Sequence, residues 1–320
     1  MKALSDLAIS IPASVTLAVS DKANALKAAG QHIIALAGGD PDFATPDHIT
    51  AAAFAAIENG ATHYPGPMKG IKPLLEAIAN TLADENGVHV NPNTDVVVTP
   101  GGKWALNLAL NALVNPGDEV IYLEPVWVSY PPMIMLAGGT PVPVSLPSGD
   151  NFRITADLLR EKVTAKTKAI MVNSPSNPTG RVLTQEEVDA VVEVALEADL
   201  YVISDEIYDK LIFDGGQHIP LAAQPGMAER TIIINGMSKA YAMTGFRIGY
   251  ACGPVDIVEA MMKIHQYSML CASIISQEAA LEAIQSGEPD MIEMREQYKL
   301  RRNFVVKAFN GLGLKCHQPR

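Results

Sequence analysis

Short apolar runs alternate with helical patterns along the middle of the chain, and this alternation constrains the fold more than any other feature. Six such runs predict strands at Val96–Thr99, Val120–Leu123, Ala169–Asn173, Tyr201–Ser204, Thr231–Asn235 and Ile248–Cys252. Most of them are apolar at nearly every position, which is typical of strands buried on both faces. Helical patterns lie between them, including Gly102–Leu113 and Gln185–Ala198. We therefore predict a mostly parallel α/β sheet that is covered on both faces.

The two ends of the chain differ from this middle part. Residues 1–44 are rich in turn residues and predict an arm that leads into a loop. From about residue 288 a charged helical pattern, Met291–Phe309, leads to a segment that is typical of the entry to a strand. We expect an arm and small-domain segment at 1–44, a large domain at 45–287, and a linking helix with the start of a C-terminal small domain at 288–320.

Composition excludes several classes of partner. The 320 residues are 48% hydrophobic, which is enough for one large core, and the formal net charge is -11. An acidic surface repels nucleic acids and anionic membranes. The sequence contains no apolar run of about 18 residues and no signal-peptide pattern near its start. Its three cysteines fit neither a disulfide framework nor a metal motif. We expect reduced thiols in the cytoplasm, no metal and no membrane partner.

Ligands of such sheets bind beyond the carboxyl ends of the strands, so the residues that follow each strand are the candidates for a site. The first strand is followed by Gly101, Gly102 and Lys103 at the start of a helix. Glycines there let backbone N–H groups approach an anion, which the helix dipole also favours. A plain turn is the commoner role of two glycines after a strand. The pattern is neither a P-loop nor a dinucleotide-binding GxGxxG.

Polar side chains also follow the predicted strands Ala169–Asn173 and Tyr201–Ser204. Asn177 lies in Ser174–Gly180, where two X-Pro steps and a glycine predict a rigid loop that presents its amide. Asp205 ends a buried strand and needs a partner such as a protonated ring nitrogen, because unpaired burial of a carboxylate is costly. Tyr208 follows closely enough to face the same cavity. Turn capping by Asn177 and helix capping by Asp205 are the alternatives.

Lys239 stands just beyond the predicted strand Thr231–Asn235. Burial among small and apolar residues lowers the pKa of a lysine, which favours the neutral amine that imine chemistry needs. Arg247, eight residues further on, offers a bidentate fork that suits a phosphate. A solvated surface residue is the usual alternative for a single lysine. Here the ends of successive strands supply an amide, a carboxylate, a phenol, an amine and a guanidinium, and this combination indicates a site.

These motifs resemble those of the class I/II aminotransferases of pyridoxal-phosphate (PLP) fold type I, and the resemblance covers nearly the whole chain. Ser174–Gly180 is similar to the family's Asn-Pro-Thr-Gly loop, Asp205–Tyr208 to its Asp-Glu-x-Tyr motif, and Ser238–Arg247 to its Ser-Lys-x-x-x-x-x-Gly-x-Arg signature. The resemblance implies an α/β fold of type I with a mostly parallel seven-stranded sheet. It also implies a small α/β domain, of which part is missing after Arg320.

The resemblance further implies roles for single residues. Lys239 would bind the PLP aldehyde as a Schiff base and then move a proton between the substrate α-carbon and C4′ of the cofactor. Asp205 would keep the pyridine nitrogen protonated, while Asn177 and Tyr208 bind the phenolic oxygen. The other implied contacts join the phosphate to Ser238, Arg247 and the backbone of Gly101, Gly102 and Lys103, the ring face to Trp127, the substrate α-carboxylate to Gly39, and a neighbouring subunit's phosphate to Tyr64. A core position is the alternative for Trp127.

Within the family, Val126–Pro131, Ala242–Gly245 and Lys103 resemble the bacterial aspartate aminotransferase branch. In that branch Ser14 and Thr16 of the arm, together with Lys103, would help to bind an acidic side chain. The resemblance thus implies amino-group transfer between an amino acid such as aspartate and a 2-oxo acid such as 2-oxoglutarate, in a homodimer with shared sites. The branch also contains enzymes for aromatic amino acids, alanine and prephenate.

The family's chains continue past the segment that is similar to Lys315–Arg320. The remainder carries the arginine that binds the substrate α-carboxylate as a bidentate pair. We therefore expect a truncated chain that binds PLP and transaminates poorly. Three alternatives remain open: a carbon–sulfur β-lyase of the same fold, a non-catalytic PLP-binding or regulatory protein, and an inactive fragment. Residues 1–44 are too short and too poor in Lys and Arg for the DNA-binding domain that such regulators add.

Overall fold

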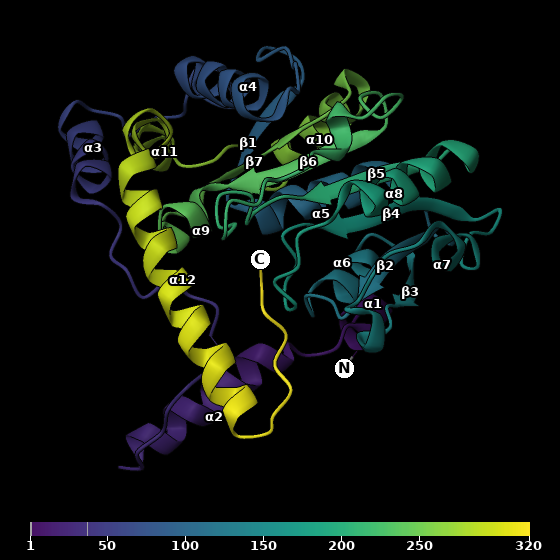
Figure 1. The fold of residues 1–320 in the computed structure, drawn as a ribbon. Coiled ribbons are helices and arrows are strands. Elements are labelled where there is room, and N and C mark those ends of the chain that lie inside the picture. The colour runs from purple at the N-terminus through teal and green to yellow at the C-terminus, as the bar shows by residue number, and fades with distance from the viewer. Residues whose placement is uncertain (1, 37) are drawn as a thin grey trace.

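The computed structural model describes residues 2–36 and 38–320 and contains a seven-stranded sheet with helices on both faces (Figure 1). The strands, in order across the sheet, are β1 (Val96–Thr99), β7 (Gly249–Cys252), β6 (Thr231–Gly236), β5 (Tyr201–Asp205), β4 (Thr167–Asn173), β2 (Glu119–Glu124) and β3 (Thr140–Ser145). β7 is antiparallel to both β1 and β6, and the other pairs are parallel. The predicted mostly parallel, doubly covered α/β sheet is confirmed.

The predicted strands agree closely with this sheet, but the edge strand β3 was not among them. Each of the other strands begins and ends within two residues of its predicted bounds. β3 carries Pro141 and Pro143, and most of its residues are exposed or half-buried. Proline cannot donate a ladder hydrogen bond and is tolerated on an edge strand. The continuous apolar pattern that marks a central strand is therefore missing at β3.

The alternation of side chains along each strand divides the core into two layers. Val97 of β1 packs into the layer beneath α5, whereas Val96 and Val98 pack on the other side, beneath α4. One face of the sheet is covered by α5 (Gly102–Leu113), α6 (Tyr130–Leu136) and α10 (Val255–Gln266). The other face is covered by α3 (Asp47–Glu58), α4 (Lys72–Asn86), α11 (Ile274–Ser286), α7 (Ala156–Arg160) and α8 (Gln185–Glu197). Both faces of the sheet are thus buried beneath helices, as the apolar strands predict.

The predicted capping box at the start of α8 is present. The Thr184 side chain accepts from the Glu187 backbone N–H, and the Glu187 carboxylate accepts from the Thr184 N–H at 3.0 Å. Glu187 is fully buried and also accepts two hydrogen bonds from the guanidinium of Arg181, at 2.8 and 2.9 Å. A bidentate ion pair of this kind fixes geometry as well as charge. It therefore anchors the end of the loop that carries Asn177.

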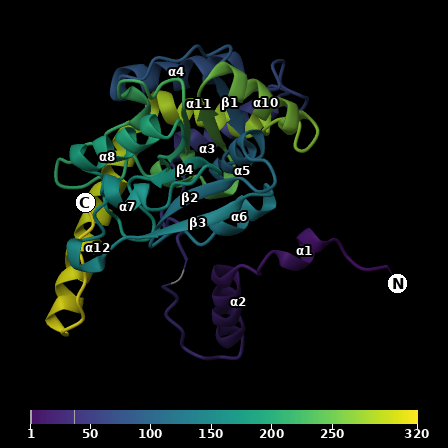
Figure 2. The same ribbon diagram turned by 90° about the vertical axis from the view of Figure 1, so that its right-hand side faces the viewer.

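The N-terminal arm and helix α12 (Glu288–Gly311) extend away from the sheet layers, whereas the last residues return to the body, where the Arg320 N–H donates to the Gly180 carbonyl at 3.0 Å. Residues 1–44 contain the helices α1 (Asp6–Ser10) and α2 (Val15–Ala28), which Figure 2 shows apart from the sheet. The turn-rich composition predicted only an arm and a loop there; Ser5 and Ser14 cap these helices. Helix α12 is longer than the predicted Met291–Phe309 and runs out from the body (Figure 1).

Four short elements complete the chain. They are η1 (Ser148–Asp150), η2 (Leu221–Ala223), α9 (Met237–Ala240) and η3 (Thr244–Phe246). Within residues 2–36 and 38–320, none of the helices combines the length and the apolar character that a membrane span requires.

Candidate active site

A cavity of about 750 Å³ opens where β4 and β5 end and where α9 follows β6. Asn173 and Asp205, the last residues of β4 and β5, both line it. This is the position that the strand-end rule predicts for a parallel sheet. The predicted site residues that line the cavity are Thr16, Gly39, Gly102, Lys103, Trp127, Asn177, Asp205, Tyr208, Ser238, Lys239 and Arg247.

Lys239 stands in α9, one turn beyond the end of β6, and its side chain is half-buried. Its Nζ donates a hydrogen bond of 2.7 Å to the carbonyl oxygen of Gly39. Burial lowers the pKa of Lys239 and the nearby charge of Arg247 lowers it further, while Asp40 acts in the opposite direction. The lysine amine is thus turned toward the cavity and shifted toward its neutral, nucleophilic form.

The start of α5 and Arg247 form a cradle for an anion. Gly101 has φ +87°, and a Cβ added there would lie 2.7 Å from Nη2 of Arg247. Gly249 of β7 approaches equally closely, since a Cβ on it would lie 2.6 Å from the backbone nitrogen of Gly102. Side chains larger than hydrogen are therefore excluded at both positions. The free N–H groups of a helix start and a guanidinium together suit a phosphate group.

Asp205 presents a buried carboxylate at the floor of the cavity. Its Oδ2 accepts a 2.5 Å hydrogen bond from the hydroxyl of Tyr130, and its Oδ1 accepts from the backbone N–H of Ile207 at 3.2 Å. Burial raises the pKa of Asp205 to about 6, although these two hydrogen bonds act against the increase. A buried carboxylate that is costly to ionise alone is suited to a cationic partner such as a protonated ring nitrogen.

Asn177 and Tyr208 lie together on one side of the cavity. Asn177 Nδ2 donates to the Tyr208 hydroxyl at 3.3 Å. Asn173 accepts the Asn177 backbone N–H at 2.7 Å and donates from Nδ2 to the Asp205 carbonyl at 2.9 Å. Burial and the charge of Asp205 raise the pKa of Tyr208, which keeps its hydroxyl protonated. The pair therefore offers two donors to an oxygen anion, held by a side chain that links β4 to β5.

Trp127 and Lys103 also line the cavity and lie against each other. Lys103 Nζ lies 4.8 Å from the centre of the Trp127 ring, and the Trp127 ring meets that of Tyr130 edge-on at 5.5 Å. Partial burial and the charge of Arg247 lower the pKa of Lys103. A flat indole and a cation thus both line the cavity, and Trp127 is a cavity residue as well as a core neighbour.

Three predicted site residues are not among those that line the cavity. Gly101 supports Arg247 from behind. Ser14 caps α2, accepts from the Leu17 N–H at 3.4 Å and lies 3.0 Å from the Thr16 hydroxyl. Tyr64 is 71% exposed. The structure of the single chain brings neither Ser14 nor Tyr64 to the cavity lining.

Several cavity residues were missed by sequence reasoning. Tyr130, Asn173, Asp40 and Thr244 line the cavity, and the Thr244 hydroxyl donates to Asp40 at 2.6 Å. Asn173 ends a predicted strand, so the strand-end rule applies to it as it does to Asp205. Tyr130 begins a short helix, and only its position three residues after Trp127 signals a role.

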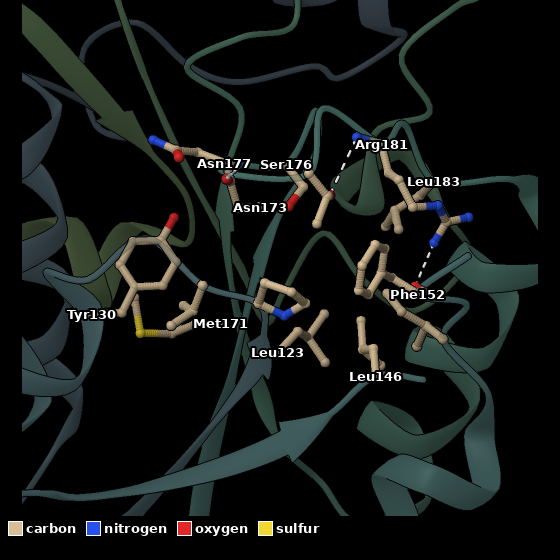
Figure 3. Close-up of a pocket in the computed structure, with 14 residues that line it drawn as sticks. Leu123, Tyr130, Leu146, Phe152, Met171, Asn173, Ser176, Asn177, Arg181 and Leu183 are labelled. Atoms are coloured by element: carbon tan, nitrogen blue, oxygen red, sulfur yellow. Dashed lines mark hydrogen bonds between the residues drawn. The ribbon is translucent and has the colours of Figure 1, made fainter. Parts of the chain in front are cut away.

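A second, much smaller pocket of about 30 Å³ adjoins the cavity behind Asn177 (Figure 3). The two share Val126, Tyr130, Asn173 and Asn177. Figure 3 shows apolar side chains, among them Phe152, gathered at one end of it. Arg181 lies at the same end and donates to the Phe152 carbonyl at 2.5 Å. The pocket is a packing space behind the Asn177 loop, and it continues the wall of the main cavity.

Comparisons with known proteins agree with this geometry. Residues 31–320 match the family model of aminotransferase class I and II. The chain is 40% identical to aspartate aminotransferase of Musicola paradisiaca over all of its length and 80% of that protein. It is 42% identical to aspartate/prephenate aminotransferase of Thermus thermophilus, again over all of its length and 82% of the relative.

Solved structures agree as well. Aspartate aminotransferase from Thermus thermophilus with maleate superimposes with a TM-score of 0.96, at 41% identity over the whole chain and 83% of that structure. These findings favour an aminotransferase over the carbon–sulfur β-lyase and the non-catalytic alternatives. The chain belongs to the class I and II aminotransferase family.

Proposed function

We propose that the cavity binds pyridoxal 5′-phosphate at Lys239 and that the chain exchanges an amino group between aspartate, or a similar amino acid, and a 2-oxo acid such as 2-oxoglutarate. One observation carries the proposal most directly. The amine of Lys239, with its lowered pKa, and the buried carboxylate of Asp205 line the same cavity as Arg247, which packs on Gly101. An aldehyde, a ring nitrogen and a phosphate need these three partners.

The side chains around the cavity fit the separate parts of the cofactor. Arg247, Ser238 and the start of α5 at Gly101–Lys103 would hold the phosphate. Asp205 would pair with the ring nitrogen. Asn177 and Tyr208 would donate to the phenolic oxygen, and Trp127 would cover the ring face. When bound, PLP supplies an aldehyde that condenses with amines and a ring that withdraws electrons from the substrate α-carbon.

The chain's own residues would then handle charge and protons. Asp205 would keep a positive charge on the ring nitrogen, and the Tyr130 hydroxyl holds that carboxylate in place. Lys239 Nζ would accept the proton from the substrate α-carbon and deliver it to C4′ of the cofactor. The lowered pKa of Lys239 favours the neutral amine that this step needs. Asp205 is only 5% exposed, so its carboxylate is largely shielded from bulk water.

Acidic substrates are supported by the charge of the cavity and by the relatives. Lys103, Lys239 and Arg247 all line it. We propose that the Gly39 backbone meets the substrate α-carboxylate, and that Lys103, Ser14 and Thr16 favour an acidic side chain. The relatives are named for aspartate and, in part, for prephenate. Aspartate is therefore the first donor to test, and prephenate the acceptor to compare with 2-oxoglutarate.

A homodimer with shared sites is part of the proposal. Tyr64 projects into solvent in the single chain, where a neighbouring subunit's phosphate would give its hydroxyl a partner. Several large apolar side chains of the first 36 residues are also exposed: Leu4, Leu7, Ile9, Leu17, Val19, Ile34 and Leu36. Burial of such side chains against a second copy would stabilise both chains. We also propose a cytoplasmic location, which the three free cysteines support.

The visible absorbance of the purified chain with added PLP tests the proposal. We expect the visible band of an imine between PLP and Lys239. The Lys239→Ala variant should lack this imine band, and so should Lys239→Arg, which keeps the charge. Addition of aspartate to the parent should convert this band toward that of the aminated cofactor, and 2-oxoglutarate should restore it. A band that persists in both variants would refute the assignment of Lys239. A band that responds to cystathionine with pyruvate release, but not to aspartate, would instead favour a lyase.

A further inference from the structure

A second group of polar side chains lies outside the cavity, on the opposite face of the sheet. We call it the Glu206 cluster, and its members are Glu206, Asp209, His218 and Asn235. Asp205 turns toward α6 and Tyr130, whereas Glu206 turns to the other face and accepts from the Ser204 hydroxyl at 2.7 Å. Glu206 is fully buried there. None of the four residues is among those that line the cavity.

The cluster joins the two segments that carry the main cavity residues. Asp209 follows Tyr208 in the turn after β5, and its backbone N–H donates to the Glu206 carbonyl at 2.9 Å. Asn235 is the last residue but one of β6, directly before the segment that leads to Lys239. Its Nδ2 donates to Asp209 Oδ2 at 2.9 Å, and its Oδ1 accepts from the Gly236 N–H at 2.7 Å. The Asn235 side chain therefore links the turn after β5 to the end of β6.

Charge within the cluster is balanced by His218. The His218 Nε2 lies 3.1 Å from Glu206 Oε2, and both side chains are buried. Burial lowers the pKa of His218, but Glu206 and Asp209 together raise it by more, which favours the imidazolium. Burial raises the pKa of Asp209 to about 6, against the effect of His218. The other groups whose charges bear on the cluster are Lys210, Tyr241, Tyr250 and Cys252.

We propose that Asp209 and Asn235 are positioning residues for the cofactor site: their hydrogen bond fixes the turn that carries Tyr208 against the strand end that leads to Lys239. The ion pair between Glu206 and His218 joins the same turn to the loop that carries His218. The inference rests on the proposed function, because it takes Tyr208 and Lys239 to contact bound PLP. A fixed Tyr208 hydroxyl would donate to the phenolic oxygen of PLP. This hydrogen bond would lower the pKa of the imine nitrogen that joins Lys239 to the cofactor.

The pH dependence of the visible absorbance of bound PLP tests this role. The direct effect is measured first, with Tyr208→Phe, which removes the donor and should raise the midpoint of the absorbance change. We expect Asp209→Ala and Asn235→Ala to raise it in the same direction, by about half a pH unit or more. The double variant should add little to either single one, because each removes the same hydrogen bond.

Conservative variants separate the hydrogen bond from charge and volume. Asp209→Asn keeps an acceptor oxygen for Asn235 and should keep the midpoint near that of the parent. Asn235→Asp keeps the acceptor for the Gly236 N–H but sets a carboxylate against Asp209 at pH 8, and should raise the midpoint without leaving a cavity. It therefore tests the proposal even if both alanine variants fail to fold.

A general loss of stability is controlled by Val188→Ala in α8, which is fully buried and outside the cavity lining. This variant should lower the melting temperature and leave the midpoint unchanged. If Asp209→Ala, Asn235→Ala and Asn235→Asp lower the melting temperature but also leave the midpoint unchanged, the cluster is only structural and the inference is wrong. A parent chain that forms no PLP band lost in Lys239→Ala overturns the proposed function, and this inference with it.

Discussion

The Tyr130 hydroxyl donates a 2.5 Å hydrogen bond to Oδ2 of Asp205, which lies 75 positions further along the chain. The bond stabilises the ionised carboxylate and so opposes the effect of burial on its pKa. We expect Tyr130→Phe to raise the pKa of Asp205 further above about 6, by about one to two units, since a hydrogen bond to a charged group contributes about 1.5–3 kcal/mol. Infrared difference spectra of the carboxylic-acid band, parent against Asp205→Asn, measure that pKa.

Tyr122→Phe is the matched control for this change, because the Tyr122 hydroxyl donates to Glu124 at 3.4 Å, outside the cavity lining. Tyr122→Phe should leave the pKa of Asp205, measured from the same band, unchanged. Equal titration of the parent and Tyr130→Phe would mean that the hydroxyl does not stabilise the carboxylate.

Replacement of Asp205 by Asn should stabilise the chain without PLP at high pH. The folded-state pKa of Asp205 is raised from 3.8 to about 6, so its effect on stability is most favourable below pH 3.8 and falls as the pH rises to about 6. Above that pH the ionised carboxylate costs about 3 kcal/mol, and roughly half of this cost is present at pH 5. Chemical unfolding at pH 5 and pH 8 measures the difference between the two proteins.

The same variant should respond less to PLP. At pH 8 the parent should gain more stability from PLP than Asp205→Asn does, because only the carboxylate pairs with a protonated ring nitrogen. An Asn variant that is less stable than the parent at pH 8, without PLP, would contradict the cost of burial assigned to Asp205.

Gly101→Ala should weaken PLP binding at least tenfold. A Cβ at Gly101 would lie 2.7 Å from Nη2 of Arg247 and displace the guanidinium from the phosphate cradle. The positive φ of +87° adds backbone strain to the substitution. Titration of PLP, followed by fluorescence or absorbance, gives the affinity.

Gly117→Ala separates the two effects, because Gly117 has φ +95° and no heavy atom near its added Cβ within the described residues. Both variants should lose about 1–3 kcal/mol of stability from strain. Only Gly101→Ala should lose affinity, and an equal loss in both would remove the role given to Arg247.

Glu187→Ala should lower the free energy of unfolding by about 3 kcal/mol or more, because it leaves Arg181 without its bidentate partner and removes the capping-box bond from the Thr184 N–H. Burial of Glu187 raises its pKa, but the hydrogen bonds from Arg181 and from the backbone N–H groups of Thr184 and Ile154, together with the charge of Arg181, lower it by more, so the net shift is downward. The stabilisation is therefore present above the unfolded-state pKa and is lost as the pH falls through the lower folded-state value. Urea unfolding at two pH values tests both statements.

The neighbouring Glu186 provides the control. Its side chain is 77% exposed and lies 3.8 Å from Arg153. Glu186→Ala should change stability by only about 0.5 kcal/mol or less. A similar loss for Glu186→Ala and Glu187→Ala would mean that the buried ion pair contributes little.

The central sheet and the strand-end residues were predictable because several independent signals coincide there. Buried parallel strands need apolar residues at consecutive positions, and this pattern survives in β4, β5 and β6. The capping box at Thr184 is equally local, since its hydrogen bonds span only three residues. Lys239, Asp205 and Asn177 follow the strands directly, so the topology itself brings them to one edge of the sheet.

Features that depend on distant contacts were not predictable in the same way. The bond from Tyr130 to Asp205 joins α6 to β5, and no local pattern marks it. His218 meets Glu206 only because the loop after the Tyr208 turn folds back under the sheet. Strand β3 lacks the apolar run because it lies at the edge. Tyr64 is exposed in the single chain, and its predicted contact concerns a second subunit.

The opposite directions of Asp205 and Glu206 bear on how the sheet assembles. A strand that is apolar on both faces, such as Tyr201–Ser204, carries little hydrophobic information about its register against its neighbours. A slip of β5 by one residue would keep its valine and isoleucine buried but exchange the two carboxylates. Glu206 would then enter the cavity, and Asp205 would have to meet His218 with a side chain one methylene shorter. Asp205 and Glu206 therefore specify the register of β5. A shifted strand would be destabilised by its misplaced carboxylates, even though its apolar residues would remain buried.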